Sequence, residues 1–226
     1  MAVIGTPVVE GVGRIAGFVN AYVFREGSDT SLIDTTMNKN ANPVRKAFDK
    51  AGVSLSSVGT ILLTHAHVDH IRGAHAVEQA SHAGVACHEV DAPAVDGRSP
   101  LRMPPVMRWF LRVRPVAVGR SLHDGDTIGP FRVVYAPGHT MGEVAFYHPG
   151  RRILFSGDSV VERKGKLTLP AAGFAADLPK AVSSLDILRK LQVDTLLPGH
   201  GVPVTRDVAP MLDELIRRAP RDYLRA

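Results

Sequence analysis

Apolar and polar residues along the first half of the chain follow two periods, one typical of strands and one typical of helices. Runs rich in apolar, β-branched and aromatic residues predict strands at Arg14–Phe24, Thr30–Asp34, Val58–Leu63 and Val85–His88. Helical spacing predicts one helix from Asn42-Pro43 to about Ala51 and another from Ile71 to Ala83. This alternation of strands and helices indicates an α/β fold.

The second half of the chain repeats the mixture of strands and helices. Strands are predicted at Phe131–Tyr135, Glu143–Tyr147, Arg152–Phe155 and Val193–Leu197. Apolar residues recur on one face of Leu178–Leu191, which predicts an amphipathic helix, and a last helix is predicted over Val208–Arg218. A chain of 226 residues with this pattern is expected to form a single domain over 1–226.

The stretch from Ala92 to Pro115 fits neither period. It holds five prolines, which argues against one regular element. Its large apolar side chains are Met103, Met107, Trp109 and Phe110. We expect this insertion to form a lid over a pocket, to pack in a homodimer, or to cover the edge of the core, and these alternatives stay open. In the first case, the four side chains are the candidate substrate-binding residues.

Composition and charge exclude few classes of protein. Hydrophobic residues make up 45% of the chain and charged residues 22%, which is ordinary for a globular protein. The net charge of +5 favours acidic partners, but the basic residues are mostly scattered, with one dense group between Arg98 and Arg120. Nucleic acid is therefore not the expected partner. No apolar run is long enough for a membrane span, and we find no signal peptide.

The single cysteine, Cys87, excludes an internal disulfide and fits a cytoplasmic location. It follows two small apolar residues in a predicted strand. We therefore expect a buried, unreactive thiol rather than a nucleophile.

The densest motif that carries chemistry is His65-Ala66-His67-Val68-Asp69-His70, which directly follows the predicted strand Val58–Leu63. A turn at the end of a strand can bring its three imidazoles and its carboxylate to one point. Imidazole and carboxylate together suit zinc and similar divalent metals. The motif therefore predicts a metal site.

Three further residues share one setting, in which an apolar strand is followed by glycine and a side chain that can bind metal. They are His139 after Gly138, Asp158 after Gly157, and His200 after Gly199. Ligands gathered at strand ends are what a metal site on a sheet requires. The neighbouring hydroxyl residues Thr64, Thr140 and Ser159 are expected either to hydrogen-bond the ligands or to cap turns.

The complete pattern, His-x-His-x-Asp-His followed by His, Asp and His, resembles the metallo-β-lactamase superfamily from about Phe18 to Val208. The resemblance implies a four-layer αβ/βα sandwich, with two mixed β-sheets packed face to face and helices on the outer faces. It also implies two divalent metal ions, with zinc expected and iron or manganese as alternatives. By this resemblance His65, His67 and His139 hold the first metal, Asp69, His70 and His200 hold the second, and Asp158 bridges both.

The activity that the resemblance implies is hydrolysis by a metal-bridging hydroxide, with an ester, lactone or thioester of a small molecule as substrate. Asp69 is also a candidate catalytic residue, because its carboxylate can orient the nucleophile or pass a proton. Asp158 and His70 together make the chain resemble the lactonase, glyoxalase II and general hydrolase branches more than the β-lactamases. The short stretch after His200 argues against a glutathione-binding region.

Two other activities of the same superfamily stay open. One is a persulfide-dioxygenase-like reaction at a single iron, against which the presence of His200 argues. The other is a phosphodiesterase or nuclease activity, which the basic charge would suit.

Overall fold

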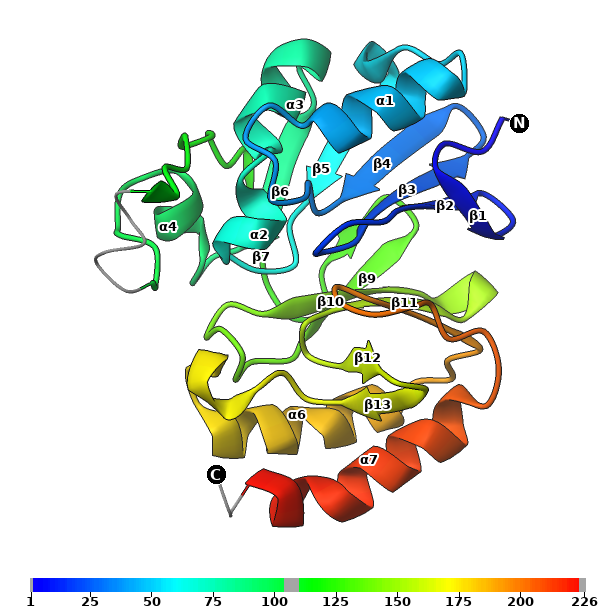
Figure 1. Ribbon diagram of the computed structural model, residues 1–226, viewed down its shortest axis with the longest axis vertical. Coiled ribbons are helices and arrows are strands. Elements are labelled where there is room, and N and C mark those ends of the chain that lie inside the picture. Colours follow the sequence, from blue (N-terminus) through cyan, green and yellow to red (C-terminus); the bar gives the residue numbers. More distant parts are fainter. Residues whose placement is uncertain (1, 104–109, 224–226) are drawn as a thin grey trace. The chain divides into compact units, whose positions relative to one another are not determined.

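The computed structural model describes residues 2–103 and 110–223, with side chains up to residue 219. The chain divides into two compact units, an N-terminal unit (Met1–Ser121) and a C-terminal unit (Leu122–Ala226). Each unit has a sheet and helices of its own (Figure 1). The expectation of a single domain over 1–226 stays a prediction.

The N-terminal unit contains a mixed, seven-stranded sheet in the order β1-β2-β3-β4-β5-β6-β7. The strands are β1 Thr6–Val9, β2 Val12–Ile15, β3 Ala21–Glu26, β4 Asp29–Ile33, β5 Thr60–Leu62, β6 Gly84–His88 and β7 Arg120–Leu122. Strands β1 to β4 are antiparallel neighbours, whereas β4, β5 and β6 run parallel. Parallel strands need crossover connections, and helices supply them here.

The crossover helices of this unit are α1 Asn42–Lys50, α2 Val68–Ile71 and α3 Ala74–Ser81. Pro43 lies in the first turn of α1, where its missing N–H costs no hydrogen bond, and Gly52 follows the helix with a positive φ of 64°. Val44 and Phe48 of α1 are fully buried and pack in one core cluster with strand residues such as Leu32. The predicted helix over Asn42–Ala51 is therefore confirmed.

The second predicted helix, Ile71–Ala83, is interrupted between α2 and α3. Gly73 lies at the interruption, and a Cβ atom there would be 2.6 Å from the carbonyl oxygen of Thr35. The chain therefore bends where only glycine permits this close approach.

The predicted strand Arg14–Phe24 is wrong as one element, because it is a hairpin formed by β2 and β3. Ile15 pairs with Ala21, and residues 16–20 form the turn between them. The turn is as apolar as the strands on either side, and its Phe18 is 76% exposed. An apolar run alone therefore does not reveal a reversal of the chain.

The C-terminal unit contains a five-stranded sheet in the order β14-β11-β10-β9-β8. Its strands are β8 Thr127–Ile128, β9 Phe131–Tyr135, β10 Val144–His148, β11 Ile153–Gly157 and β14 Thr195–Pro198. A separate two-stranded ribbon is formed by β12 Val161–Arg163 and β13 Lys166–Thr168. Strand β14 lies parallel to β11, and the other pairs in the main sheet are antiparallel.

Two long helices, α6 Leu178–Arg189 and α7 Val208–Tyr223, pack with one face of this sheet (Figure 1). Leu185 and Leu188 of α6 are fully buried in the cluster that holds Leu154 and Leu196 of the sheet. At roughly 1.5–3 kcal/mol for each large apolar side chain, this burial is a main source of the unit's stability. Both helices and the four strands predicted in this half are confirmed within a few residues.

The insertion at 92–115 begins with a short helix, α4 Ala92–Val95, whose Ala92 and Val95 are buried in the core of the N-terminal unit. Leu101 and Val113 pack against the same core. This part of the insertion therefore covers the core edge, one of the three expected roles. Of the four candidate side chains, Met103 is half-buried and Phe110 is 65% exposed, whereas Met107 and Trp109 lie outside the described residues.

Candidate metal centre

Four of the candidate ligands lie on the loop after β5 and on helix α2 of the N-terminal unit. His65 and His70 are fully buried, and His67 and Asp69 are half-buried. The ring centroid of His65 is 4.8 Å from that of His67 and 4.1 Å from that of His70. Oδ2 of Asp69 is 3.9 Å from Nε2 of His70. The structure thus brings these four side chains together within one unit.

A buried aspartate, Asp34, organises this group from the end of β4. It is 2% exposed and adopts a positive φ of 56°, a conformation that few residues other than glycine adopt. Its Oδ1 accepts a hydrogen bond from the backbone N–H of Thr64 at 2.9 Å. Its Oδ2 accepts from the Thr64 hydroxyl at 2.9 Å and from Nδ1 of His70 at 2.8 Å.

These hydrogen bonds determine which nitrogen of each buried imidazole carries the proton. Because Asp34 accepts from Nδ1 of His70, that nitrogen is protonated. The Thr64 hydroxyl donates its hydrogen bond to Asp34. The hydroxyl oxygen of Thr64 therefore accepts from Nδ1 of His65, 3.0 Å away. Both imidazoles therefore present the lone pair of Nε2, which is the form that binds a metal ion.

Two further residues fix the backbone of the motif. Oδ2 of Asp91 accepts from the backbone N–H of Ala66 at 2.7 Å. The hydroxyl and the backbone N–H of Thr35 both donate to the carbonyl oxygen of His70 at 2.8 Å. Thr35, Asp34 and Asp91 were not predicted from the sequence. Asp34 follows an apolar strand, as the ligands do, so the strand-end rule could have found it, whereas Asp91 offered no such signal.

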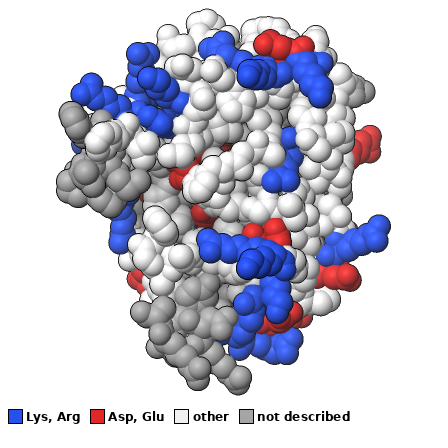
Figure 2. Space-filling view, in the orientation of Figure 1, with Lys and Arg blue, Asp and Glu red and all other residues white. Residues whose placement is uncertain are grey.

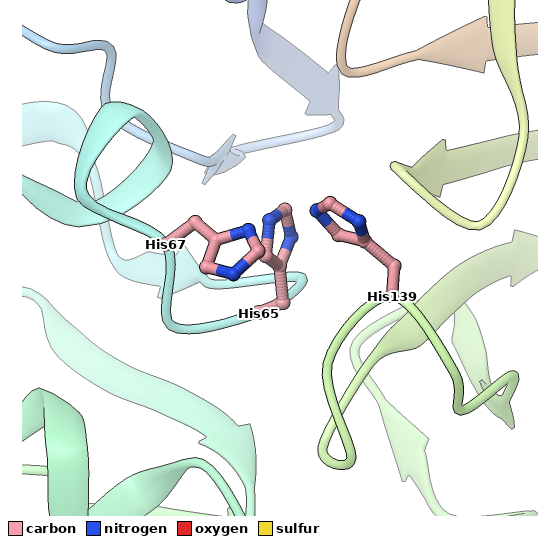
Figure 3. Close-up of side chains that lie close together, drawn as sticks. All are labelled: His65, His67 and His139. Atoms are coloured by element: carbon pink, nitrogen blue, oxygen red, sulfur yellow. The ribbon is translucent and has the colours of Figure 1, made fainter. Parts of the chain in front are cut away.

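The other three candidate ligands lie on separate loops of the C-terminal unit. His139 is on the loop after β9, Asp158 directly follows β11, and His200 follows β14. Figure 3 draws His139 as sticks, and His65 and His67 of the N-terminal unit as well. Oδ2 of Asp158 is 3.4 Å from Nε2 of His139 and 3.3 Å from Nε2 of His200.

These distances fit the ligands of a metal ion. Two ligands at about 2.1 Å from a tetrahedral ion lie about 3.4 Å apart. Oδ2 of Asp158 has this spacing to Nε2 of both His139 and His200. The donor set is nitrogen and oxygen without cysteine, which suits zinc, iron or manganese at a catalytic rather than a structural site.

The loop that carries His139 is fixed against the start of α6. The backbone N–H groups of Ala176 and Asp177 donate to the carbonyl oxygens of His139 and Gly138, both at 2.9 Å. Gly138 has a φ of 139°, and a Cβ atom there would be 2.2 Å from the backbone nitrogen of Ala181. Glycine is therefore required for this loop to approach the helix.

The turn that carries Asp158 is held by a buried glutamate, Glu143, which directly precedes β10. This side chain is fully buried, and its Oε1 accepts from the backbone N–H of Asp158 at 2.8 Å and of Ser159 at 3.1 Å. The Ser159 hydroxyl donates to the carbonyl oxygen of Ser156, so it caps the turn. Of the two roles expected for Ser159, the structure favours the turn.

A second buried glutamate, Glu162 of β12, holds the loop that carries His200. Its backbone N–H donates to the carbonyl oxygen of His200 at 3.0 Å, and its Oε2 accepts from the backbone N–H of Val202 at 2.8 Å. The loop is also tied to the Asp158 turn, since Gly199 N–H donates to the Gly157 carbonyl at 2.7 Å. Neither glutamate was predicted from the sequence, although an acidic residue in a predicted apolar strand is a signal for Glu143.

Cys87 is fully buried in β6, as expected. Burial, together with the nearby carboxylates of Asp91 and Asp96, raises the pKa of its thiol to about 12. At neutral pH the thiol is therefore protonated and unreactive.

Charged side chains are spread widely over the surface. On the face seen in Figure 2, Lys and Arg form several separate groups with Asp and Glu among them. In the basic stretch of the insertion, Arg98 donates to Asp96 at 2.7 Å. No helix among the described residues is long and apolar enough to cross a membrane.

Residues 14–200 match the sequence model of the metallo-β-lactamase superfamily, and the chain belongs to this superfamily. Its αβ/βα sandwich, the fold expected from the sequence, is confirmed. Members of the superfamily bind divalent metals, and relatives of this chain carry the names of hydrolases.

Three similar proteins illustrate this membership. The chain is 25% identical over 185 residues to "Probable metallo-hydrolase YybB" of Bacillus subtilis (strain 168), covering 81% of this chain and 80% of that protein. The chain is 43% identical over 101 residues to a hydroxyacylglutathione hydrolase of Rhodobacter capsulatus, and this match covers 45% of the chain and 33% of that enzyme. TTHA1623, whose crystal structure is known in a di-iron-bound form, is 30% identical to the chain in sequence. The two structures match with a TM-score of 0.67 over 83% of this chain and 89% of TTHA1623.

Proposed function

We propose that the chain is a dinuclear metal-dependent hydrolase that cleaves an ester, lactone or thioester bond of a small molecule. The observation that carries the proposal is the orientation of the candidate ligands. Hydrogen bonds of Nδ1 to Asp34 and Thr64 leave the Nε2 lone pairs of His70 and His65 available for a metal ion, which supports the proposal. In the other unit, one oxygen of Asp158 has metal-ligand spacing to two imidazoles.

In this proposal the ligands of the two units act together. His65, His67 and His139 hold one ion, Asp69, His70 and His200 hold the other, and Asp158 is shared by both. A shared carboxylate offsets the repulsion between two cations, which favours a dinuclear site. Zinc is the expected metal from the order of affinities, and iron is the main alternative because TTHA1623 was crystallised in a di-iron-bound form.

When bound, two such ions lower the pKa of a shared water towards neutrality and polarise the bond under attack. The chain's own residues do the rest. Asp34 and Thr64 hold the imidazoles in place. Asp69, whose side chain is 21% exposed, is the carboxylate that takes a proton from the attacking water and passes it to the leaving group.

Among the three bond types, the relatives named hydroxyacylglutathione hydrolases favour thioesters, although the match spans only 33% and 44% of two of those enzymes and the sequence argues against a glutathione-binding region. In this proposal the insertion at 92–115 supplies the apolar wall of the substrate pocket, with Met103 and Phe110 as the candidates among the described residues, and contributes to a homodimer. A cytoplasmic location remains the expectation from the single cysteine.

The test of this function is activity against a panel of aryl esters, lactones, thioesters and phosphodiesters, measured together with metal content. We expect hydrolysis of at least one carboxylic ester, lactone or thioester, with two divalent ions per chain. Cleavage of the phosphodiesters alone would move the chain to the nuclease alternative. Protein purified with a single iron and no zinc, and without activity on the panel, would favour the dioxygenase alternative.

A further inference from the structure

Glu143 is a buried carboxylate that the proposed hydrolysis does not use as a ligand, an acid or a base. It stands at the junction of two loops of the C-terminal unit. Its carbonyl oxygen accepts from the N–H of Ala136 at 3.0 Å and so closes the loop that presents His139. Its side chain reaches the turn that presents Asp158. One residue therefore links the positions of two candidate ligands.

We propose that Glu143 is a positioning residue of the metal centre, which sets the place of the Asp158 carboxylate relative to the imidazole of His139. The inference rests on the proposed metal site and concerns the holding of metal rather than the reaction. Glu143 touches neither the reacting bond nor the ions in this proposal, and acts through the backbone of Asp158.

The geometry explains why this residue is a glutamate. A single oxygen, Oε1, accepts the N–H groups of two successive residues, Asp158 at 2.8 Å and Ser159 at 3.1 Å. Two donors that converge on one oxygen fix the orientation of the peptide unit between them. The side chain at position 143, directly before β10, must be long enough to reach the N–H groups of Asp158 and Ser159, and it must accept through oxygen. Because the site is fully buried, water does not replace the acceptor when it is lost.

Other hydrogen bonds hold the same turn at different atoms. Ser159 N–H also points to the carbonyl oxygen of Ser156 at 3.1 Å, and Gly157 accepts from Gly199. These bonds close the turn but none of them involves the N–H of Asp158 itself. Oε1 of Glu143 thus accepts directly from the backbone N–H of Asp158, the proposed shared ligand.

Two substitutions separate the reach of the side chain from its charge. Glu143→Gln keeps the length and an oxygen acceptor but removes the charge, whereas Glu143→Asp keeps the charge but is one methylene shorter. If Glu143 acts by position, Glu143→Asp should weaken zinc binding by about 10- to 100-fold, as the loss of an outer-shell partner does, and Glu143→Gln should stay within a few-fold of the wild type. Zinc affinity is measured by competition with a chromophoric chelator, and the visible spectrum of the cobalt(II)-loaded protein reports the ligand geometry.

Leu188→Ala is the matched control for a general loss of stability. Leu188 is fully buried in α6, and its apolar side chain makes no hydrogen bond to the loops that carry the candidate ligands. This variant should lower the melting temperature and leave zinc affinity and the cobalt spectrum unchanged. If it weakened zinc binding as much as Glu143→Asp does, the effect of Glu143 would be one of stability and the inference would be wrong.

The remaining outcomes are equally decisive. Equal zinc affinity in the wild type and Glu143→Asp, or a larger loss in Glu143→Gln than in Glu143→Asp, would overturn the positioning role while leaving the proposed function intact. A wild-type chain that binds metal but hydrolyses nothing would overturn the proposed function and leave the inference standing. A wild-type chain that binds no divalent metal would overturn both.

Discussion

The two units present their candidate ligands in different ways. The N-terminal unit supplies four ligands from one loop and one short helix, and Asp34 orients two of their imidazoles by side-chain hydrogen bonds. The C-terminal unit supplies three ligands from three loops, and two buried glutamates hold those loops by their backbone N–H and carbonyl groups. A compact motif thus needs its rings oriented, whereas a dispersed set needs its loops fixed.

The largest effect is expected when Asp158, the ligand that the two proposed metal ions share, is removed. Asp158→Ala should lower the occupancy of at least one metal and reduce hydrolysis by about 10³-fold or more, because metal charge stabilisation is worth several kcal/mol. Metal content per chain and kcat/KM are the measurements. Asp194→Ala is the control, since Asp194 is an exposed aspartate of the same unit whose side chain is 67% exposed. Unchanged metal content in Asp158→Ala would refute the bridging role.

The next effect tests the orientation of imidazoles in the N-terminal unit. Asp34→Asn places an amide N–H₂ where Asp34 now accepts from Thr64 and His70, which favours the other tautomer of His70. Metal affinity should fall by about 10- to 100-fold. Asp29→Asn, an exposed change on β4, the strand that precedes Asp34, should have no effect. Nitrogen chemical shifts of the His70 ring report the tautomer, and an unchanged tautomer with unchanged affinity would show that Asp34 does not orient this ring.

A smaller effect is expected when Glu162 no longer holds the His200 loop of the C-terminal unit. Glu162→Ala removes the acceptor for Val202 N–H and loosens the loop of His200, which is a single ligand, so metal affinity should fall by about tenfold. Glu214→Ala on α7, where the side chain is 49% exposed, is the matched control. A loss greater than that of Asp34→Asn would reverse the order expected from the comparison.

The smallest effect concerns Cys87, which belongs to neither ligand set. Its pKa of about 12 lies above the usual value near 8.5, so the folded state favours the protonated thiol. This contribution to stability is complete below about pH 8.5 and is lost as the pH rises towards 12. At pH 7 a thiol reagent should therefore react only after unfolding. Rapid labelling of the native protein, with a loss of activity, would show that the thiol is accessible.

How far the sequence predicts the fold depends on whether the determining contacts are local. The helix α1 was predicted almost to the residue, because Pro43 and Gly52 mark its ends within the segment itself. The hairpin of β2 and β3 was missed because its turn is apolar, and the ribbon β12–β13 was missed because strands of three residues carry too little pattern. The two-unit division of the contacts also has no counterpart in composition.

The candidate site divides in the same way. His65 to His70 are visible in the sequence because they are adjacent, and His139, Asp158 and His200 because each follows a strand and a glycine. The residues that orient them are not visible, since their roles depend on distant partners. Asp34 and His70, for example, are 36 residues apart in the chain, and Glu162 and Val202 are 40 apart.

The most direct test of the proposed function is the restoration of activity to metal-free protein. After chelation, zinc is added back in steps while bound metal and hydrolysis of the best panel substrate are measured on the same sample. A dinuclear hydrolase should bind two ions per chain and reach full activity only as the second is bound. Hydrolysis that persists without metal, or a chain that binds no more than one ion, would contradict the proposal.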